Sequence, residues 1–127
     1  MKAVFVDSSV LFSAVNSPTG GSSKLFTVDN LKLTTSKVVL TEVERNIREK
    51  LHHYHLERFF LLVNKLTILD QLPDEKSLGR ARKVIVEKDA TILAEARQAK
   101  TDFLVTLDKK HFLTPAVVKF LLIPPQV

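Results

Sequence analysis

Hydrophobic residues in this chain form short continuous runs that are separated by stretches with helical spacing. Continuous runs typical of buried parallel strands occupy residues 2–7 and 102–108. Weaker strand patterns lie at 31–36, 66–69 and 117–125. Because helical patterns alternate with these runs, the sequence predicts a parallel α/β sheet between helical layers.

Helical spacing of apolar residues fills most of the intervals between the predicted strands. The predicted helices cover residues 8–15, 24–30, 37–51, 54–65, 80–86 and 89–100. Residues 16–23 hold two of the three glycines and a proline, which predicts a flexible loop, and 71–79 is predicted as a turn or linker. The helix at 37–51 has two candidate starts, a Ser36 cap or a capping box of Thr41 and Glu44.

Length and composition indicate an ordinary globular chain. The 127 residues, 45% of them hydrophobic and 26% charged, are expected to form one domain, 1–127. No apolar run approaches the ~18 residues of a membrane span, and no signal-peptide pattern is present, so we expect a cytoplasmic protein without a membrane partner. The absence of cysteine excludes disulfides and thiolate metal sites. A net charge of +5 mildly favours a polyanionic partner such as RNA.

Four acidic residues occupy positions where the predicted fold could bring them together. Asp7 and Asp108 follow the two strongest strand patterns, and the carboxyl ends of parallel strands border the working crevice of such sheets. Asp89 opens a helix on its apolar face, and Glu42 lies in the helix after the second strand. Asp102 begins its strand at the opposite end from Asp108, so we interpret it as structural.

Carboxylates gathered at one point would repel one another unless a cation lay between them. Oxygen ligands without cysteine suit Mg²⁺ or Mn²⁺ rather than Zn²⁺. Each acid also has a structural interpretation: Asp7 and Asp89 as helix caps, Asp108 in a turn, and Glu42 on a solvated helix face. Taken singly these structural interpretations are favoured, whereas the four positions together favour a metal site.

Several segments resemble, in order and spacing, the acidic blocks of PIN-domain ribonucleases. They are VFVDSSVLFSA, SKVVLTEVERNI, EKDATILAEA and DFLVTLDKKHF, followed by the closing block LTPAVVKFLL. The resemblance spans nearly the whole chain. It implies a three-layer α/β/α sandwich and a metal-dependent endoribonuclease that uses a metal-activated water to hydrolyse RNA.

The resemblance also implies roles for individual residues. The residues that match the family's catalytic and metal-binding acids are Asp7, Glu42, Asp89 and Asp108. Ser9 and Thr106 match supporting hydroxyl positions, although Ser9 replaces a commoner asparagine. Members of the family often act as toxins with an antitoxin partner and often form homodimers. Basic residues near the expected site or the glycine loop are candidate RNA contacts, namely Lys24, Arg45, Lys109 and Lys110.

Two other functions remain open at this point. A catalytically inactive PIN-fold protein could bind RNA or act as a scaffold without turnover, and it would bind RNA independently of metal. A receiver-like phosphoacceptor would need clustered acids after the first strand and an acceptor aspartate after a middle strand. The segments VDSS and LTTS supply neither, so this function is the least favoured.

Overall fold

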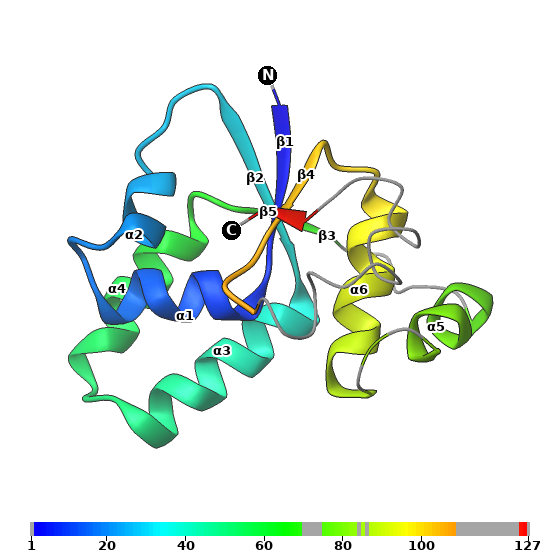
Figure 1. The fold of residues 1–127 in the computed structure, drawn as a ribbon. Coiled ribbons are helices and arrows are strands. Elements are labelled where there is room, and N and C mark those ends of the chain that lie inside the picture. Colours follow the sequence, from blue (N-terminus) through cyan, green and yellow to red (C-terminus); the bar gives the residue numbers. More distant parts are fainter. Residues whose placement is uncertain (1, 70–74, 84, 86, 109–124, 127) are drawn as a thin grey trace.

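A five-stranded parallel sheet lies between two layers of helices (Figure 1). The computed structural model describes residues 2–69, 75–83, 85, 87–108 and 125–126. In chain order the elements are β1 (Lys2–Val6), α1 (Ser8–Asn16), α2 (Gly21–Leu25), β2 (Leu31–Ser36), α3 (Lys37–Lys50), α4 (Tyr54–Val63), β3 (Thr67–Leu69), α5 (Glu75–Arg82), α6 (Glu87–Ala99), β4 (Phe103–Val105) and β5 (Pro125–Gln126).

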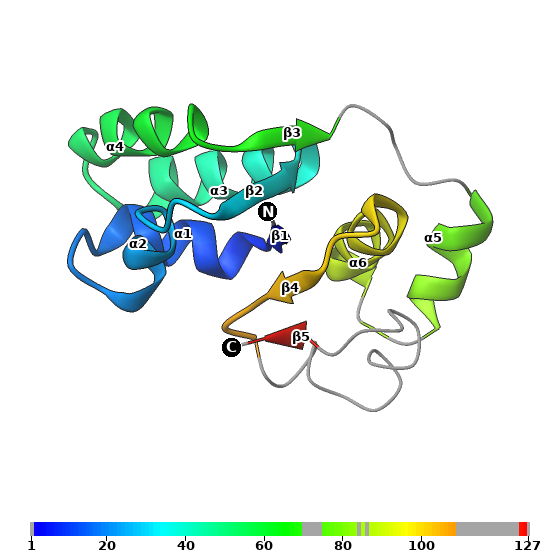
Figure 2. The same cartoon turned by 90° about the horizontal axis from the view of Figure 1, so that it is seen from above.

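The strand order is β3-β2-β1-β4-β5, and every described pairing is parallel. Helices α1 to α4 cover one face of the sheet, and α5 and α6 cover the other (Figure 2). The predicted three-layer α/β/α architecture is therefore confirmed. Strand β1 lies in the middle of the sheet, and Val4, Phe5 and Val6 are almost completely buried. This explains why its apolar run is continuous rather than alternating.

Helix α3 packs against the core through the stripe that the sequence predicts. Val39, Val43 and Ile47 recur every four residues and are fully buried. Of the two predicted starts the structure has the Ser36 cap, because its Oγ accepts a hydrogen bond from the Val39 N–H at 3.2 Å. Thr41 instead donates back to the Lys37 carbonyl within the helix.

Three helices, α2, α5 and α6, begin earlier than predicted. Helix α2 starts at Gly21, inside the predicted flexible loop, because the Ser23 hydroxyl donates to the Ala14 and Ser17 carbonyls at the end of α1. The Arg58 guanidinium of α4 adds hydrogen bonds to the Ala14 carbonyl and to Ser23. Those partners lie far away in the sequence, so local composition could not reveal them.

Helix α5 starts at Glu75, within the segment predicted as a linker. Gly79 lowers the intrinsic helix propensity of α5, and packing against α6 compensates for this effect. Helix α6 begins at Glu87, two residues before the predicted start, and the strand predicted over 102–108 is shortened to β4. Of the strand predicted at 117–125, only Pro125 lies in the described part of the chain, in β5.

Side chains on the outer helix α4 divide between the core and the surface. Phe59 and Leu62 are buried, whereas Phe60 and Leu61 are 50% and 65% exposed.

Among the helices of the described residues, none has the length and apolarity needed to cross a bilayer.

Candidate functional site at the carboxyl edge of the sheet

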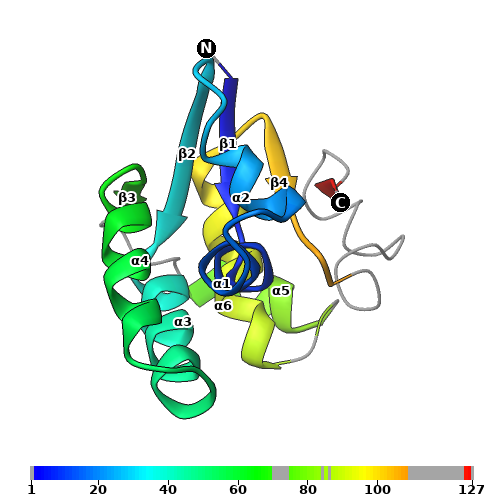
Figure 3. The same cartoon turned by 90° about the vertical axis from the view of Figure 1, so that its left-hand side faces the viewer.

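The central feature of the candidate site is a buried aspartate directly after β1. Strands β1, β2 and β4 run in the same direction, so their carboxyl ends lie at one edge of the sheet (Figure 3). Asp7 lies at that edge and is only 2% exposed. Its Oδ1 accepts a hydrogen bond from the Val10 N–H at 3.0 Å, which makes Asp7 the N-cap of α1. The carboxylate is thereby held by the helix that follows it.

Two hydroxyl groups join Asp7 to the chain after β4. The Ser9 hydroxyl donates to Asp7 Oδ1 at 2.7 Å and accepts from the Leu107 N–H at 3.0 Å. The Thr106 hydroxyl donates to Asp7 Oδ2 at 2.5 Å and accepts from the Asp108 N–H at 2.9 Å. Each hydroxyl is thus both donor and acceptor, and together they fix the orientation of the Asp7 carboxylate relative to the backbone at Asp108.

Burial is the dominant influence on the Asp7 carboxyl and raises its pKa above the ordinary value. Hydrogen bonds from Thr106, Ser9 and the Val10 N–H lower the pKa, and the nearby Asp108 raises it further. Among the described residues, no cationic side chain contributes to this balance. The Asp7 carboxylate and its negative neighbour therefore form an arrangement that a bound divalent cation would stabilise.

The other two predicted acids have different surroundings. Glu42 is half-buried on α3, where it lines a hollow of about 390 Å³ together with Lys37, Val38, Thr41 and Arg45. Asp89 lies in the first turn of α6, and its side chain is outside the part of the chain that the structure describes. Within the described residues, no three acidic or histidine side chains form a group that could hold a metal ion. Convergence of all four acids thus stays a prediction.

The candidate RNA contacts are dispersed. Arg45 lies in the hollow beside Glu42, together with Lys37, which sequence analysis did not select. Lys24 lies in α2, which packs near the carboxyl end of α1. Asp7 lies at the opposite end of α1, which is about 13 Å long. Lys109 and Lys110 lie outside the described residues.

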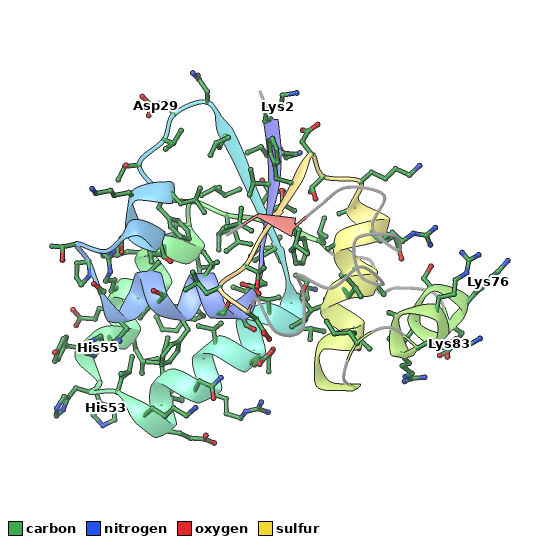
Figure 4. All side chains as sticks on the ribbon, in the orientation of Figure 1. Lys2, Asp29, His53, His55, Lys76 and Lys83 are labelled. Atoms are coloured by element: carbon green, nitrogen blue, oxygen red, sulfur yellow. The ribbon has the colours of Figure 1, made fainter. Side chains whose placement is uncertain are left out.

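Asp102 has the structural role expected from the sequence. Its carboxylate accepts the Ala3 N–H at 2.8 Å, and its own N–H donates to the Ala3 carbonyl. These contacts join the beginnings of β1 and β4, at the opposite end of the strands from Asp7. Figure 4 labels this end of the molecule with Lys2 and Asp29.

Sequence analysis missed one buried acid, Glu95. It lies in the middle of α6, three residues after Ile92, and is 3% exposed. Burial raises the pKa of Glu95 to about 7, and a hydrogen bond with the Ser36 side chain partly opposes this effect. The signal that could have identified it is its position inside a run of apolar residues, between Ala94 and Ala96.

These features define a parallel α/β/α domain in which Asp7 and Asp108 follow the carboxyl ends of two neighbouring strands. The PIN domain family model matches residues 4–116, and the chain belongs to this family. No curated protein resembles the chain closely enough in sequence to count as a match.

Solved structures with the same fold include three from bacterial toxins or toxin–antitoxin pairs. VapBC2 from Rickettsia felis, bound to a DNA fragment from its promoter, has a TM-score of 0.72 and 19% identity, with 90% of this chain and 94% of that chain covered. VapBC-1 from nontypeable Haemophilus influenzae has a TM-score of 0.68 and 16% identity, covering 98% and 96%. VapC20 from Mycobacterium tuberculosis, a sarcin-ricin loop cleaving toxin, has a TM-score of 0.62 and 14% identity, covering 84% and 91%.

Proposed function

We propose that this protein is a metal-dependent endoribonuclease and the toxin of a toxin–antitoxin pair. The observation that carries the proposal is the buried Asp7 carboxylate, oriented by Ser9 and Thr106 and placed near the negative charge of Asp108. Membership of the PIN domain family supports the nuclease activity. The similarity to VapC20, a toxin that cleaves the sarcin-ricin loop, supports an RNA substrate.

The residues that would hold a Mg²⁺ or Mn²⁺ ion are Asp7, Glu42, Asp89 and Asp108. Hard oxygen donors fit either ion, and the unfavourable burial of Asp7 fits a site that is completed by a cation. When bound, such an ion lowers the pKa of a coordinated water and neutralises charge on a phosphodiester.

The protein's own residues would orient the reacting groups. Ser9 and Thr106 donate to different oxygens of the Asp7 carboxylate, so that both oxygens have a defined direction. Both hydroxyls also accept backbone N–H groups from the segment that leads to Asp108. These hydrogen bonds would hold Asp7 and the backbone at Asp108 in a fixed relative position while the substrate binds.

Basic side chains would hold the RNA backbone next to the acids. Lys37 and Arg45 lie on the same hollow as Glu42, where phosphate groups of a bound strand would meet positive charge. Lys109 and Lys110 follow Asp108 in the sequence and remain candidate contacts. Lys24 lies on α2, near the carboxyl end of α1, and also remains a candidate contact.

The partners proposed are an antitoxin and a second copy of this chain. The toxin–antitoxin complexes VapBC2 and VapBC-1 support an antitoxin. The exposed Phe60 and Leu61 of α4 provide an apolar surface that a protein partner would cover. A cytoplasmic location remains the expectation from the sequence.

Cleavage of a single-stranded RNA should be measured with Mn²⁺, with Mg²⁺ and with a chelator, in wild type, Asp7→Asn and Glu42→Gln. We expect metal-dependent cleavage by wild type and a loss of at least about 100-fold in both variants. Asp102→Asn is the matched control, because the same residue type lies at the opposite end of the strands. Full activity in Asp7→Asn would overturn the proposal, and metal-independent RNA binding without turnover would favour an inactive PIN-fold protein.

A further inference from the structure

A second hollow lies between α3 and α4, beside the one that contains Glu42. It has a volume of about 530 Å³, which is within the range of small-molecule sites in proteins. Its apolar lining is buried at Phe59 and half-buried at Leu40 and Val63. The two helices pack side by side on the outside of the domain (Figure 3). The proposed reaction does not use this hollow.

The two hollows adjoin along α3. Thr41 and Arg45 line both of them and are exposed, one helical turn apart. The first hollow also contains Lys37 and Glu42, and the second continues along α3 to Arg48. Glu42 and Arg48 are about 9 Å apart along the helix axis, and consecutive phosphates of a stacked strand are about 3.4 Å apart. A strand that is cleaved near Glu42 would therefore bring a base only a few nucleotides away to the second hollow.

Phe60 presents an aromatic ring to the second hollow, and this side chain is 50% exposed. Its ring meets that of the buried Phe59 edge to face, with the ring centroids 5.2 Å apart and an interplanar angle of 63°. The buried neighbour restrains the Phe60 ring and leaves part of it accessible. Bases stack on accessible rings of this kind in proteins that bind single-stranded nucleic acid.

The charges that line the second hollow balance, whereas those that line the first are positive on balance. In the second hollow, two arginines accompany two glutamates, namely Arg45, Arg48, Glu44 and Glu49. Arg48 is paired with Glu44 at 3.3 Å, and no ion pair to Arg45 is found within the described residues. A neutral base, unlike a phosphate, is not repelled by the glutamates. Arg45 lies where a phosphate between the two hollows would meet its charge.

We propose that the hollow between α3 and α4 binds an unpaired base of the RNA substrate, which stacks on Phe60 while Arg45 contacts the phosphate between the two hollows. This inference rests on the proposed function, because the strand that it describes is the substrate of the acidic site. The RNA must be single-stranded at this position, since a base inside a duplex is stacked between its neighbours. A protein bound over Phe60 and Leu61 would exclude the base.

The test measures binding of a fluorescein-labelled decaadenylate RNA by fluorescence anisotropy, in an Asp7→Asn background that prevents cleavage. Phe60→Leu keeps an apolar side chain and removes the ring, so we expect about tenfold weaker binding. Phe60→Trp retains a ring and should bind as tightly as the background protein. The same backbone without bases should bind Phe60→Leu and the background protein equally. Leu61→Ala is the matched control, because Leu61 is 65% exposed on the same helix and is not among the residues that line the hollow.

The salt dependence of binding separates the two proposed contacts. Arg45→Gln should reduce the slope of log affinity against log salt concentration by about 0.7, because one phosphate contact is lost. Phe60→Leu should leave this slope unchanged, since stacking releases no counterions. An unaltered slope in Arg45→Gln would remove the phosphate contact from the proposal.

Three outcomes would overturn the base site: unchanged affinity in Phe60→Leu, an equal loss in Leu61→Ala, or an equal loss for the strand without bases. A change of oligomeric state in both variants, with unaltered RNA affinity, would assign the hollow to a protein partner instead. Because Phe60 is already half exposed, we expect Phe60→Leu to remain folded, which circular dichroism checks. The proposed function fails separately, if the wild type with Mn²⁺ leaves RNA uncleaved while binding still depends on Phe60.

Discussion

Replacement of Glu95 by glutamine should make the free energy of unfolding less dependent on pH. The carboxyl of Glu95 has an ordinary pKa of 4.5, and burial raises the pKa to about 7 in the folded protein. Between these two values the folded state binds more protons than the unfolded state. The stability of the wild type therefore falls as pH rises through this range, and glutamine removes that component.

The magnitude follows from the two pKa values. Each tenfold change in proton affinity corresponds to about 1.4 kcal/mol, so the full effect of Glu95 is about 3 kcal/mol. Between pH 5 and pH 8, Glu95→Gln should gain about 2–3 kcal/mol in stability relative to wild type. Glu95 is 3% exposed, so solvent screening reduces this value little.

Urea unfolding followed by circular dichroism at several values between pH 5 and pH 8 measures the effect. Asp7 also has a raised pKa, but it is present in both proteins and cancels in the difference. Glu49→Gln is the control, because this glutamate is exposed on α3 and should leave the pH profile of the wild type unchanged. Parallel pH profiles for Glu95→Gln and wild type would refute the reasoning about its burial.

Three further changes test other parts of the structure. Asp7→Asn should abolish RNA cleavage yet raise the melting temperature at pH 8, since the raised pKa of this carboxyl means that its charge is costly when buried; a lower melting temperature would contradict this account. Asp102→Ala should cost about 1 kcal/mol in urea unfolding through its lost bond to Ala3, with cleavage unchanged. Arg58→Met should cost about 1–3 kcal/mol, because its guanidinium joins α4 to α1 and α2; unchanged stability would show that these hydrogen bonds contribute nothing net.

The regular parts of the fold could be predicted because their patterns are local. Val39, Val43 and Ile47 recur with helical spacing, and the structure buries all three on α3. The continuous run at Val4–Val6 correctly predicted a central parallel strand. Where the prediction was wrong, at the starts of α2 and α5, the stabilising partners lie on other elements. Ser23 and Arg58 illustrate this, since they meet only after α4 has folded back over α1.

The candidate site was predictable as a set of residue types but not as a set of contacts. Asp7 and Asp108 could be selected because each follows a strand pattern. The sequence could not reveal that the Thr106 hydroxyl donates to Asp7, ninety-nine residues away. Nor could it decide between the structural and functional interpretations of Asp7, which caps α1 with the same carboxylate that the proposed site requires.

The sequence by itself therefore determined the α/β class, the central strand and the identity of the acids that end the strands. Those features depend on the periodicity of hydrophobic residues and on residue order, both of which are properties of the sequence alone. Only the tertiary structure decided how deeply Asp7 and Glu95 are buried and which hydroxyls orient the Asp7 carboxylate. Burial and long-range hydrogen bonds arise when distant segments pack together, and they set the proton affinities on which the proposed chemistry depends.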